Sequence, residues 1–488
     1  MKKHRRIVQI IALILVVLLA GGVVVGALMS ALAEDAPVAR DRYELSMEYL
    51  EDEQALQISQ RLVYINQTGA ALDRVVFYAM PNALRREAAL FYESDDLEAV
   101  FPSGYTPGGM DLRSVRVNGA EAEYGFQGEN ELYLRVACDL APGASAVFEF
   151  DYYLLLTRCN AFVGVGDTDV RLTAFYFIPG VWDAANGEFA LKKPLAYTRW
   201  LYSDAADYRV TLTLPEGYVA AGTGEQSGGV IVADNAREFA VAFGKRWRVA
   251  EKATASGMRV RVFSNRRDAG DTADRVVRAV EQCEAWFGAF PVRELDIAQT
   301  DYPLGALNAP GLILLPESLM GDAGEMALRF CVAQQVFGLS AYVEPSADAW
   351  LSDSVSNYVS YLMLEDARGH DAFLSAVNRD WVSALQLTIP GGLTVTSDAS
   401  LFTAKNYDIV VMKRGATVLY ELREAMGLDK LLDGLKRFYE MGQDGRTLTE
   451  MDFVHCMDDA SGKSWEAFLT DWVFNVGDYV NQPIDWLN

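Results

Sequence analysis

The chain has 488 residues, of which 51% are hydrophobic, with 43 basic and 67 acidic side chains, five cysteines and three histidines. Its length predicts two or three domains that can each bury a core, and its apolar content excludes a disordered chain. The net charge of −24 argues against nucleic-acid binding, which needs a basic surface, and five cysteines are too few for a disulfide scaffold.

Residues 1–33 are expected to form a membrane anchor or a signal peptide. Four basic residues precede an apolar run over residues 7–28, which is long enough to span a bilayer with the rest of the chain outside the cytosol. Because Ala31-Leu32-Ala33 resembles a signal cleavage site, two alternatives stay open. The protein is either anchored in the cell membrane with an extracytoplasmic body, or secreted after cleavage behind Ala33. Without residues 1–33 the net charge is −28, which favours solubility or cationic partners.

Residues 39–250 are expected to form a β-sandwich domain. Short segments rich in β-branched and aromatic residues alternate with turn sequences such as Asn118-Gly119, a pattern typical of packed antiparallel sheets. Strands are predicted over residues 43–48, 57–66, 132–137, 146–155, 208–214 and 230–233. Cys138 and Cys159 lie within or beside successive strands, so both a disulfide and two free thiols stay open.

Residues 251–488 are expected to form a mainly helical α+β domain with a small sheet at its start. Strands are predicted over residues 295–299 and 312–315. Apolar residues spaced by three and four predict a helix over residues 273–287. Further helices are predicted over residues 326–337, 351–364, 409–426, 430–441, 450–459 and 465–474.

The three histidines restrict the chemistry that the chain can perform. They stand at positions 4, 370 and 455, with no H-x-x-x-H pair anywhere, so no helix can present two imidazoles to zinc at positions i and i+4. No G-x-S-x-G nucleophile elbow occurs either.

Five segments carry a family resemblance in the order of the chain. They are DYRVTLTLPEGYVAAGTGE at 207–225, YPLGALNAPGLILL at 302–315, WLSD at 350–353, KRGA at 413–416 and LTEMDFVHCMDDASGKSWEAFLTDW at 448–472. Together they resemble the zinc aminopeptidases of the membrane alanyl aminopeptidase type, which are gluzincin metallopeptidases with a thermolysin-like catalytic domain. The resemblance implies that residues 251–488 have this thermolysin-like fold.

The zinc-binding helix of that family resembles Gln334-Gln335-Val336-Phe337-Gly338, which stands where the family has H-E-x-x-H. Gln334 and Gly338 thus replace the two histidine ligands, and Gln335 replaces the general-base glutamate. Glutamine is a poor zinc ligand and glycine has no ligand to offer. Gln335 cannot take a proton from water at neutral pH.

Three further positions implied by the resemblance have also changed. Asp353 stands for the third ligand, a glutamate, at a spacing four residues shorter than in the family. Asn308 replaces the exopeptidase-motif glutamate that holds the substrate amine, and Met412 replaces the tyrosine that stabilises the oxyanion. Methionine has no hydrogen to donate to an oxyanion.

The sequence therefore predicts a catalytically inactive, metallopeptidase-like protein that uses no cofactor and binds a peptide or protein partner. The binding remnant would comprise Asn308, Gln334, Gln335 and Asp353. An open alternative is that these polar groups pair with one another and fill the former site.

Two other functions are compatible with the sequence. An active zinc aminopeptidase could use a displaced site with Asp348, Asp353, Glu365 and a shifted histidine, and zinc is expected only in this case. Its weakness is that His370 and His455 lie outside the helix that must supply two ligands. The chain could also be a structural subunit of a membrane complex that contacts its neighbours through the sandwich face.

Overall fold

A computed structural model describes residues 39–87, 90–199, 201–382, 387 and 392–474. The predicted anchor or signal, residues 1–33, lies outside these residues. No helix within the described ranges is long and apolar enough to cross a membrane. The described residues from Arg40 onward belong to one compact unit.

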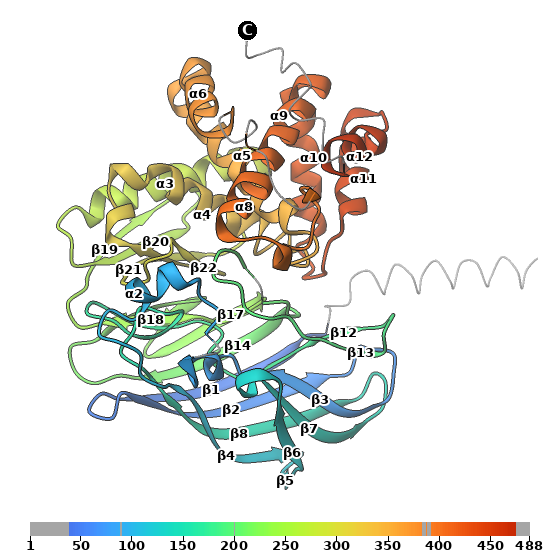
Figure 1. The fold of residues 1–488 in the computed structure, drawn as a ribbon. Helices are drawn as coiled ribbons and strands as arrows, with labels where there is room; N and C mark the ends of the chain where they lie inside the picture. The colour runs from blue at the N-terminus through green and yellow to red at the C-terminus, as the bar shows by residue number, and fades with distance from the viewer. Residues whose placement is uncertain (1–38, 88–89, 200, 383–386, 388–391, 475–488) are drawn as a thin grey trace, which may run out of the picture. The chain divides into compact units, whose positions relative to one another are not determined.

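The first half of this unit is built on an eight-stranded sheet, drawn from blue to green in Figure 1. In spatial order its strands are β16 (Glu225–Ser227), β17 (Val230–Ala236), β14 (Ala206–Thr213), β1 (Asp41–Leu50), β2 (Ala55–Ile65), β8 (Ser145–Leu155), β4 (Gly109–Val117) and β5 (Ala120–Glu121). In β1, Tyr43, Leu45, Met47 and Tyr49 are buried while the residues between them face solvent. This alternation of period two gives a strand with one face toward a core.

Two four-stranded sheets cover that buried face. One is β11 (Ile178–Pro179), β3 (Leu72–Tyr78), β7 (Tyr133–Leu140) and β6 (Tyr124–Gln127); the other is β15 (Val219–Gly222), β18 (Val241–Gly244), β10 (Val170–Leu172) and β9 (Val163–Val165). Aromatic contacts tie the layers together: Phe77 on β3 meets Phe148 and Phe150 on β8, each at 5.2 Å between ring centroids. A hairpin of β12 (Val181–Asp183) and β13 (Glu188–Ala190) and a short helix, α2 (Leu97–Val100), complete this half.

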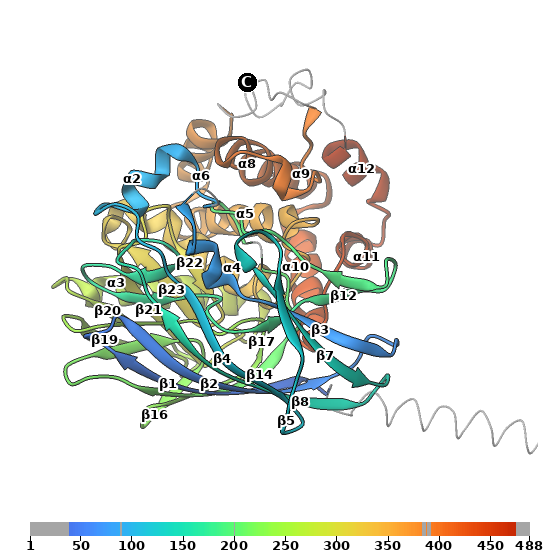
Figure 2. The same ribbon diagram turned by 60° about the horizontal axis from the view of Figure 1, so that its bottom comes forward.

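The second half starts with a five-stranded sheet and continues as helices. In spatial order, the strands of this sheet are β19 (Arg248–Ala253), β20 (Arg259–Ser264), β21 (Glu294–Thr300), β23 (Leu312–Pro316) and β22 (Leu307–Ala309). The helices are α3 (Ala269–Phe287), α4 (Glu325–Phe337), α5 (Ala349–Arg368), α6 (His370–Val377), α8 (Ala404–Tyr407), α9 (Gly415–Met426), α10 (Leu428–Met441), α11 (Glu450–Ser461) and α12 (Glu466–Phe474). Figures 1 and 2 both show α4 beside β22.

The predicted class, a β-rich first half followed by a mainly helical half, is confirmed. The boundary predicted after residue 250 falls inside β19, whose partner strand β20 belongs to the sheet of the helical half. The predicted helix over residues 409–426 is divided, because residues Asp408–Arg414 form a π-helical segment before α9 begins at Gly415. Cys138 and Cys159 are both free thiols in the structure.

Candidate functional site

The site is built on α4 and α5, two helices that the core surrounds. Gln334 and Gln335 near the end of α4 are 6% and 1% exposed, and Asp353 in the first turns of α5 is 4% exposed. Buried amides and carboxylates must find hydrogen-bond partners, because leaving them unpaired costs about 1–3 kcal/mol each. The partners of these three side chains therefore define what the site can do.

Gln334, Asp353 and Asn308 form a chain of direct contacts across the two helices and β22. The Gln334 amide nitrogen donates to Asp353 Oδ1 at 2.8 Å, and its oxygen accepts from Asn308 Nδ2 at 2.9 Å. Asn308 Nδ2 also donates to the Cys331 carbonyl at 3.0 Å. The nitrogen and the oxygen of the Gln334 amide thus both form hydrogen bonds within the protein.

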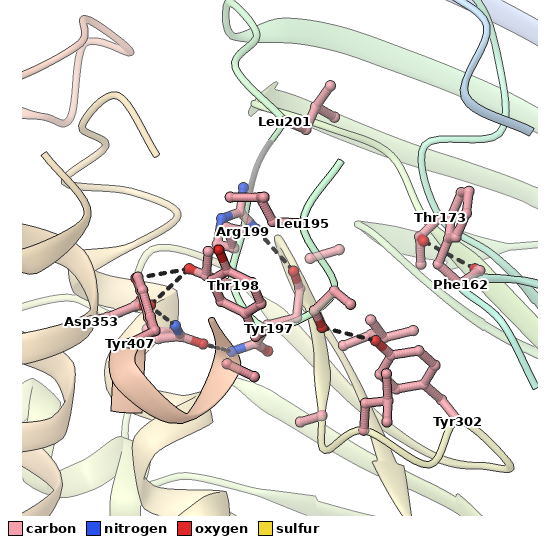
Figure 3. A pocket seen from close by; sticks show the side chains of 18 of the residues that line it. Phe162, Thr173, Leu195, Tyr197, Thr198, Arg199, Leu201, Tyr302, Asp353 and Tyr407 are labelled. Atoms are coloured by element: carbon pink, nitrogen blue, oxygen red, sulfur yellow. Dashed lines mark hydrogen bonds between the residues drawn. The ribbon is translucent and has the colours of Figure 1, made fainter. Parts of the chain in front are cut away.

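Asp353 is the acceptor on which the cluster converges. Ser352 Oγ lies 3.1 Å from Oδ1, and the Tyr407 hydroxyl donates to Oδ2 at 2.7 Å. Thr198 Oγ1 lies 3.0 Å from Oδ2 and 2.9 Å from the Tyr407 hydroxyl. Figure 3 shows Thr198, Asp353 and Tyr407 turned toward one another. Burial and the charge of Asp353 raise the pKa of Tyr407 well above its usual value, so its hydroxyl stays protonated as a donor.

Gln335 points to a different place from Gln334. Its Nε2 donates to Asn308 Oδ1 and to the Ala309 carbonyl, both at 3.1 Å, and its Oε1 accepts from the Gly311 backbone at 2.9 Å. Gly311 has φ of +71° in the two-residue turn between β22 and β23, a conformation that suits glycine. Gln335 therefore secures this turn, and it lines a second cavity of about 320 Å³.

Gly338 ends α4, and a side chain at this position would require its neighbours to shift. Its backbone N–H donates to the Gln334 carbonyl at 2.9 Å. A Cβ added here would lie 2.7 Å from Ser352 Oγ and 3.2 Å from the Gln334 carbonyl oxygen. The Ser352 hydroxyl thus lies where a larger side chain at position 338 would start.

A cavity of about 300 Å³ remains open beside this cluster. Its wall includes the polar cluster residues Asn308, Gln334, Asp353, Tyr407 and Thr198, and also Met412. The β-rich half adds Phe91, Tyr92, Phe162 and Leu195, and the segment between β21 and β22 adds Tyr302. Gln335 and Gly338 do not belong to this wall. Of the six positions singled out in the sequence, four therefore share the cavity.

An ion pair between Arg199 and Glu238 lies beside β22. Arg199 Nη1 donates to Glu238 Oε1 at 3.0 Å and to the Asn308 carbonyl at 2.9 Å. Both charged side chains line the cavity, so the β-rich half contributes charged groups to the site as well as apolar ones.

Among the residues of this site that were not predicted from the sequence are Thr198, Arg199, Glu238 and Tyr407. Thr198 meets Asp353 across 155 positions, and Glu238 meets Arg199 across 39. No periodicity marks contacts between segments so far apart. Tyr407 carried a weak signal, since it is a tyrosine five positions before Met412, where the resemblance implied one.

The residues of the displaced-site alternative lie apart from the cavity, except Asp353. His370 Nδ1 lies 2.6 Å from Glu365 Oε1, and both Glu365 oxygens also accept from Arg423. Asp348 and Glu365 stand at opposite ends of α5. Across the described ranges, no group of three or more His, Cys, Asp and Glu side chains could hold a metal ion.

Comparisons with known proteins identify proteins that are similar to this chain. No protein-family model matches the sequence. The chain is 23% identical over 255 residues to aminopeptidase N of Lactococcus lactis subsp. lactis and 23% identical over 258 residues to aminopeptidase N of Lactobacillus delbrueckii subsp. lactis. These matches cover 46% and 48% of this chain but only 29% of either relative, so the chain spans less than a third of the curated relatives it matches.

The fold has solved neighbours that extend over nearly the whole chain. The M1 zinc metallopeptidase of Deinococcus radiodurans superposes with a TM-score of 0.60 at 17% identity, covering 92% of this chain and 95% of the neighbour. A mutant of the same protein gives a TM-score of 0.61 over 92% and 96% of the two chains.

The prediction that no cofactor is involved is wrong at the level of the family, because these fold neighbours are zinc metallopeptidases. Zinc is the cofactor that the relationship implies. The residues at the corresponding positions do not fit a zinc ion: the Gln334 amide is bonded at both ends, Asp353 is engaged by surrounding donors, and Gly338 is blocked by Ser352. Tetrahedral zinc sites need three or four nitrogen, sulfur or carboxylate ligands.

The resemblance seen in the sequence is thus supported by two independent kinds of comparison. Sequence similarity covers about half of the chain, and the fold similarity covers 92% of it. The chain is related to the aminopeptidase-type M1 gluzincin metallopeptidases.

Proposed function

We propose that this protein is a non-hydrolysing relative of the M1 metallopeptidases that binds a peptide or a protein tail in its cleft. The observation that carries the proposal is the open cavity beside a polar cluster whose members bond to one another. A cavity of about 300 Å³ lies at the lower end of the range of small-ligand sites. It combines apolar walls with a few polar groups, which is the usual composition of such sites.

Loss of hydrolysis follows from the groups that would have to handle protons and negative charge. Gln335 lies outside the cavity wall, and its amide is held by Asn308 and the β22–β23 turn, so no general base stands at that position. Met412 cannot donate a hydrogen bond to an oxyanion, and the nearby Tyr407 hydroxyl already donates its hydrogen to Asp353. Removing one oxyanion donor costs about 100- to 1,000-fold in rate.

A peptide is the ligand class that the fold neighbours support. The mutant M1 zinc metallopeptidase of D. radiodurans bound to a Tyr-Ser-Ala substrate superposes on this chain with a TM-score of 0.59 at 18% identity. An uncleaved tripeptide of this kind would meet Asn308, Gln334 and the Arg199–Glu238 pair, which offer amide and charged hydrogen-bonding groups on the cavity wall.

The test is a calorimetric titration of the full-length chain with Tyr-Ser-Ala, followed by mass spectrometry of the peptide. We expect saturable binding and recovery of intact peptide. Ala306→Trp, which places a large ring on the cavity wall, should weaken binding at least tenfold. Ala120→Trp on the exposed strand β5 is the matched control and should bind as the unmodified chain does. Cleavage of the peptide, or no saturable binding to the unmodified chain, would contradict the proposal.

We also propose that the protein acts outside the cytosol, anchored through residues 7–28 or released after Ala33. The apolar run behind four basic residues supports this location. Alkaline extraction of membranes together with mass determination of the N-terminus would distinguish the two forms. Recovery of the chain in the soluble cytosolic fraction with its N-terminal segment intact would contradict both.

A further inference from the structure

The charged side chains on the wall of the cavity do not balance one another. Among the described residues, the wall holds three carboxylates, Asp353, Glu238 and Asp408, and one guanidinium, Arg199. Arg199 pairs with Glu238 at 3.0 Å, and Lys413, which lies outside the wall, pairs with Asp408 at 2.5 Å. The charge of Asp353 is therefore the one that no cation of the wall neutralises.

Asp353 is also the buried member of this set, with 4% of its surface exposed. Its hydrogen bonds come from neutral donors, which are the Gln334 amide and the hydroxyls of Ser352, Thr198 and Tyr407. Neutral donors stabilise a carboxylate but leave its charge in place. Because charges interact more strongly inside a protein than in water, this charge attracts a cation beside it.

A second group of carboxylates lies at the edge of the same cavity, on the segment that follows Tyr92 of the wall. Glu93 Oε1 accepts from the backbone N–H of Ala404, another residue of the wall, at 3.1 Å. Burial raises the pKa of Asp96, and the charges of Glu93 and Asp95 raise it further. No described cation lies within ion-pair distance of Glu93 or Asp96, so both charges stay unpaired.

Asp398 adds a carboxylate to this edge from the helical half. Burial, followed by the charges of Glu93 and Asp398, raises the pKa of Tyr197 to about 12, and Tyr197 lines the cavity (Figure 3). The Tyr197 hydroxyl lies 2.8 Å from the carbonyl oxygen of Ala399, the residue after Asp398. Glu93, Asp96 and Asp398 are called the acidic rim below.

Two cations near the acidic rim do not neutralise it. Arg171 acts on Tyr302 of the wall, where it lowers the pKa that burial and the charge of Asp96 raise. Arg171 is itself fully buried in a 2.6 Å ion pair with Asp169. Lys405 is an exposed residue of α8 that does not line the cavity, and its single charge offsets only one of the three rim carboxylates.

We propose that the peptide bound in this cleft is a basic one, with a Lys or Arg side chain in addition to its α-ammonium group, which rests on the proposed function. Asp353 and the acidic rim together carry more than one unneutralised negative charge, so a ligand with more than one positive charge complements them best. Both oxygens of Asp353 already accept hydrogen bonds. The attraction is therefore one of charge and needs no new hydrogen bond to Asp353.

The experiment is a calorimetric titration of the full-length chain with Tyr-Ser-Ala, Tyr-Lys-Ala and Tyr-Glu-Ala. We expect Tyr-Lys-Ala to bind at least about tenfold more tightly than Tyr-Glu-Ala, with Tyr-Ser-Ala between them. The preference should shrink at high sodium chloride concentration, because salt screens the exposed rim charges. It should persist when the three peptides are N-acetylated, which distinguishes a charged side chain from the α-ammonium group as its source.

A double variant, Glu93→Gln with Asp96→Asn, removes two rim charges and keeps an acceptor for the Ala404 N–H. It should reduce the preference for Tyr-Lys-Ala at least about threefold. Glu48→Gln with Glu53→Gln removes two charges from exposed positions at β1 and the turn after it, and this matched control should leave the preference unchanged.

The proposal would be overturned if Tyr-Lys-Ala bound no more tightly than Tyr-Glu-Ala, if the preference vanished on N-acetylation, or if both double variants reduced it equally. Binding and intact recovery of Tyr-Ser-Ala alongside any of these results would leave the proposed function standing. If none of the three peptides bound, both proposals would fail.

Discussion

At the scale of single residues, Asp353 is the central acceptor of the polar cluster beside the cavity. It is a buried carboxylate whose partners are neutral groups: the Gln334 amide and the hydroxyls of Ser352, Thr198 and Tyr407. Such a cluster is stable only when every member is satisfied. The carboxylate therefore ties α4, α5 and α8 together through hydrogen bonds.

The Tyr407 hydroxyl is expected to be the strongest single contributor to this cluster. Tyr407→Phe should lower the free energy of unfolding by about 1.5–3 kcal/mol, because it removes a hydrogen bond to a charged acceptor. Tyr197→Phe is the control, since the Tyr197 hydroxyl contacts only the neutral carbonyls of Ala399 and Phe402 and should cost about 0.5–1.5 kcal/mol. Urea unfolding measures both. An equal or smaller loss in Tyr407→Phe would show that Asp353 does not depend on it.

Gly338 tests how closely the end of α4 is packed. Gly338→Ala would bring a methyl group to 2.7 Å from Ser352 Oγ, and such overpacking should cost about 1–3 kcal/mol in unfolding free energy. Gly270 lies inside α3 with open space where its Cβ would be, so Gly270→Ala should be neutral or stabilising by up to about 1 kcal/mol. If Gly338→Ala behaved like Gly270→Ala, the position could accept a side chain after all.

At the scale of secondary-structure elements, the start of α5 carries a pH-dependent contribution to stability. Asp348 is the residue before this helix, and burial together with the nearby charge of Glu344 raises the pKa of Asp348 to about 6. The folded chain thus holds a proton on the Asp348 carboxyl more tightly than the unfolded chain does. The resulting stability is fully present below about pH 4, near the pKa of an exposed aspartate, and is lost as the pH rises through 6.

Asp348→Asn should therefore leave stability at pH 4 unchanged and increase it at pH 8 by about 1–2 kcal/mol. This gain is smaller than the pKa shift alone would give, because solvent screens the charge of the partly exposed side chain. Asparagine keeps the shape and is equally favoured before a helix. Urea unfolding at the two pH values measures the difference. A gain of equal size at both would assign the effect to helix capping instead of to the charge.

The elements that could be predicted from the sequence are those with a strong period. The strand over residues 43–48 and the helix over 273–287 agree with β1 and α3, because burial of one face imposes the period on the residues. The helix α6 was not predicted, and the π-helical segment Asp408–Arg414 was predicted as part of one longer helix. A π-helical turn holds one more residue than an α-helical turn, and in so short an apolar run this difference does not change the sequence pattern.

The positions of the site were reachable from the sequence only through the family resemblance. The resemblance pointed to Asn308, Gln334, Asp353 and Met412, which line one cavity. It could not say that Gln335 turns toward β22 and β23, since that depends on the backbone N–H of Gly311. Nor could it supply Thr198 and Arg199, whose contacts depend on how the β-rich half meets the helical half.

At the scale of the whole molecule, a fold related to zinc metallopeptidases is combined with a cavity in which neutral donors hold the Asp353 carboxylate. The cavity remains, Gln335 lies outside its wall, and the Tyr407 hydroxyl donates to Asp353. We infer that the fold has been kept for binding. This inference holds whether or not a metal ion is supplied, because neither Gln335 nor Met412 gains a proton-transfer role from one.

The most direct test of this account is the release of free tyrosine from Tyr-Ser-Ala by the full-length chain saturated with zinc, with the D. radiodurans M1 metallopeptidase as the positive control. We predict that the chain releases no tyrosine above the protein-free rate, with or without added zinc. Zinc-dependent release that a chelator abolishes would contradict the account.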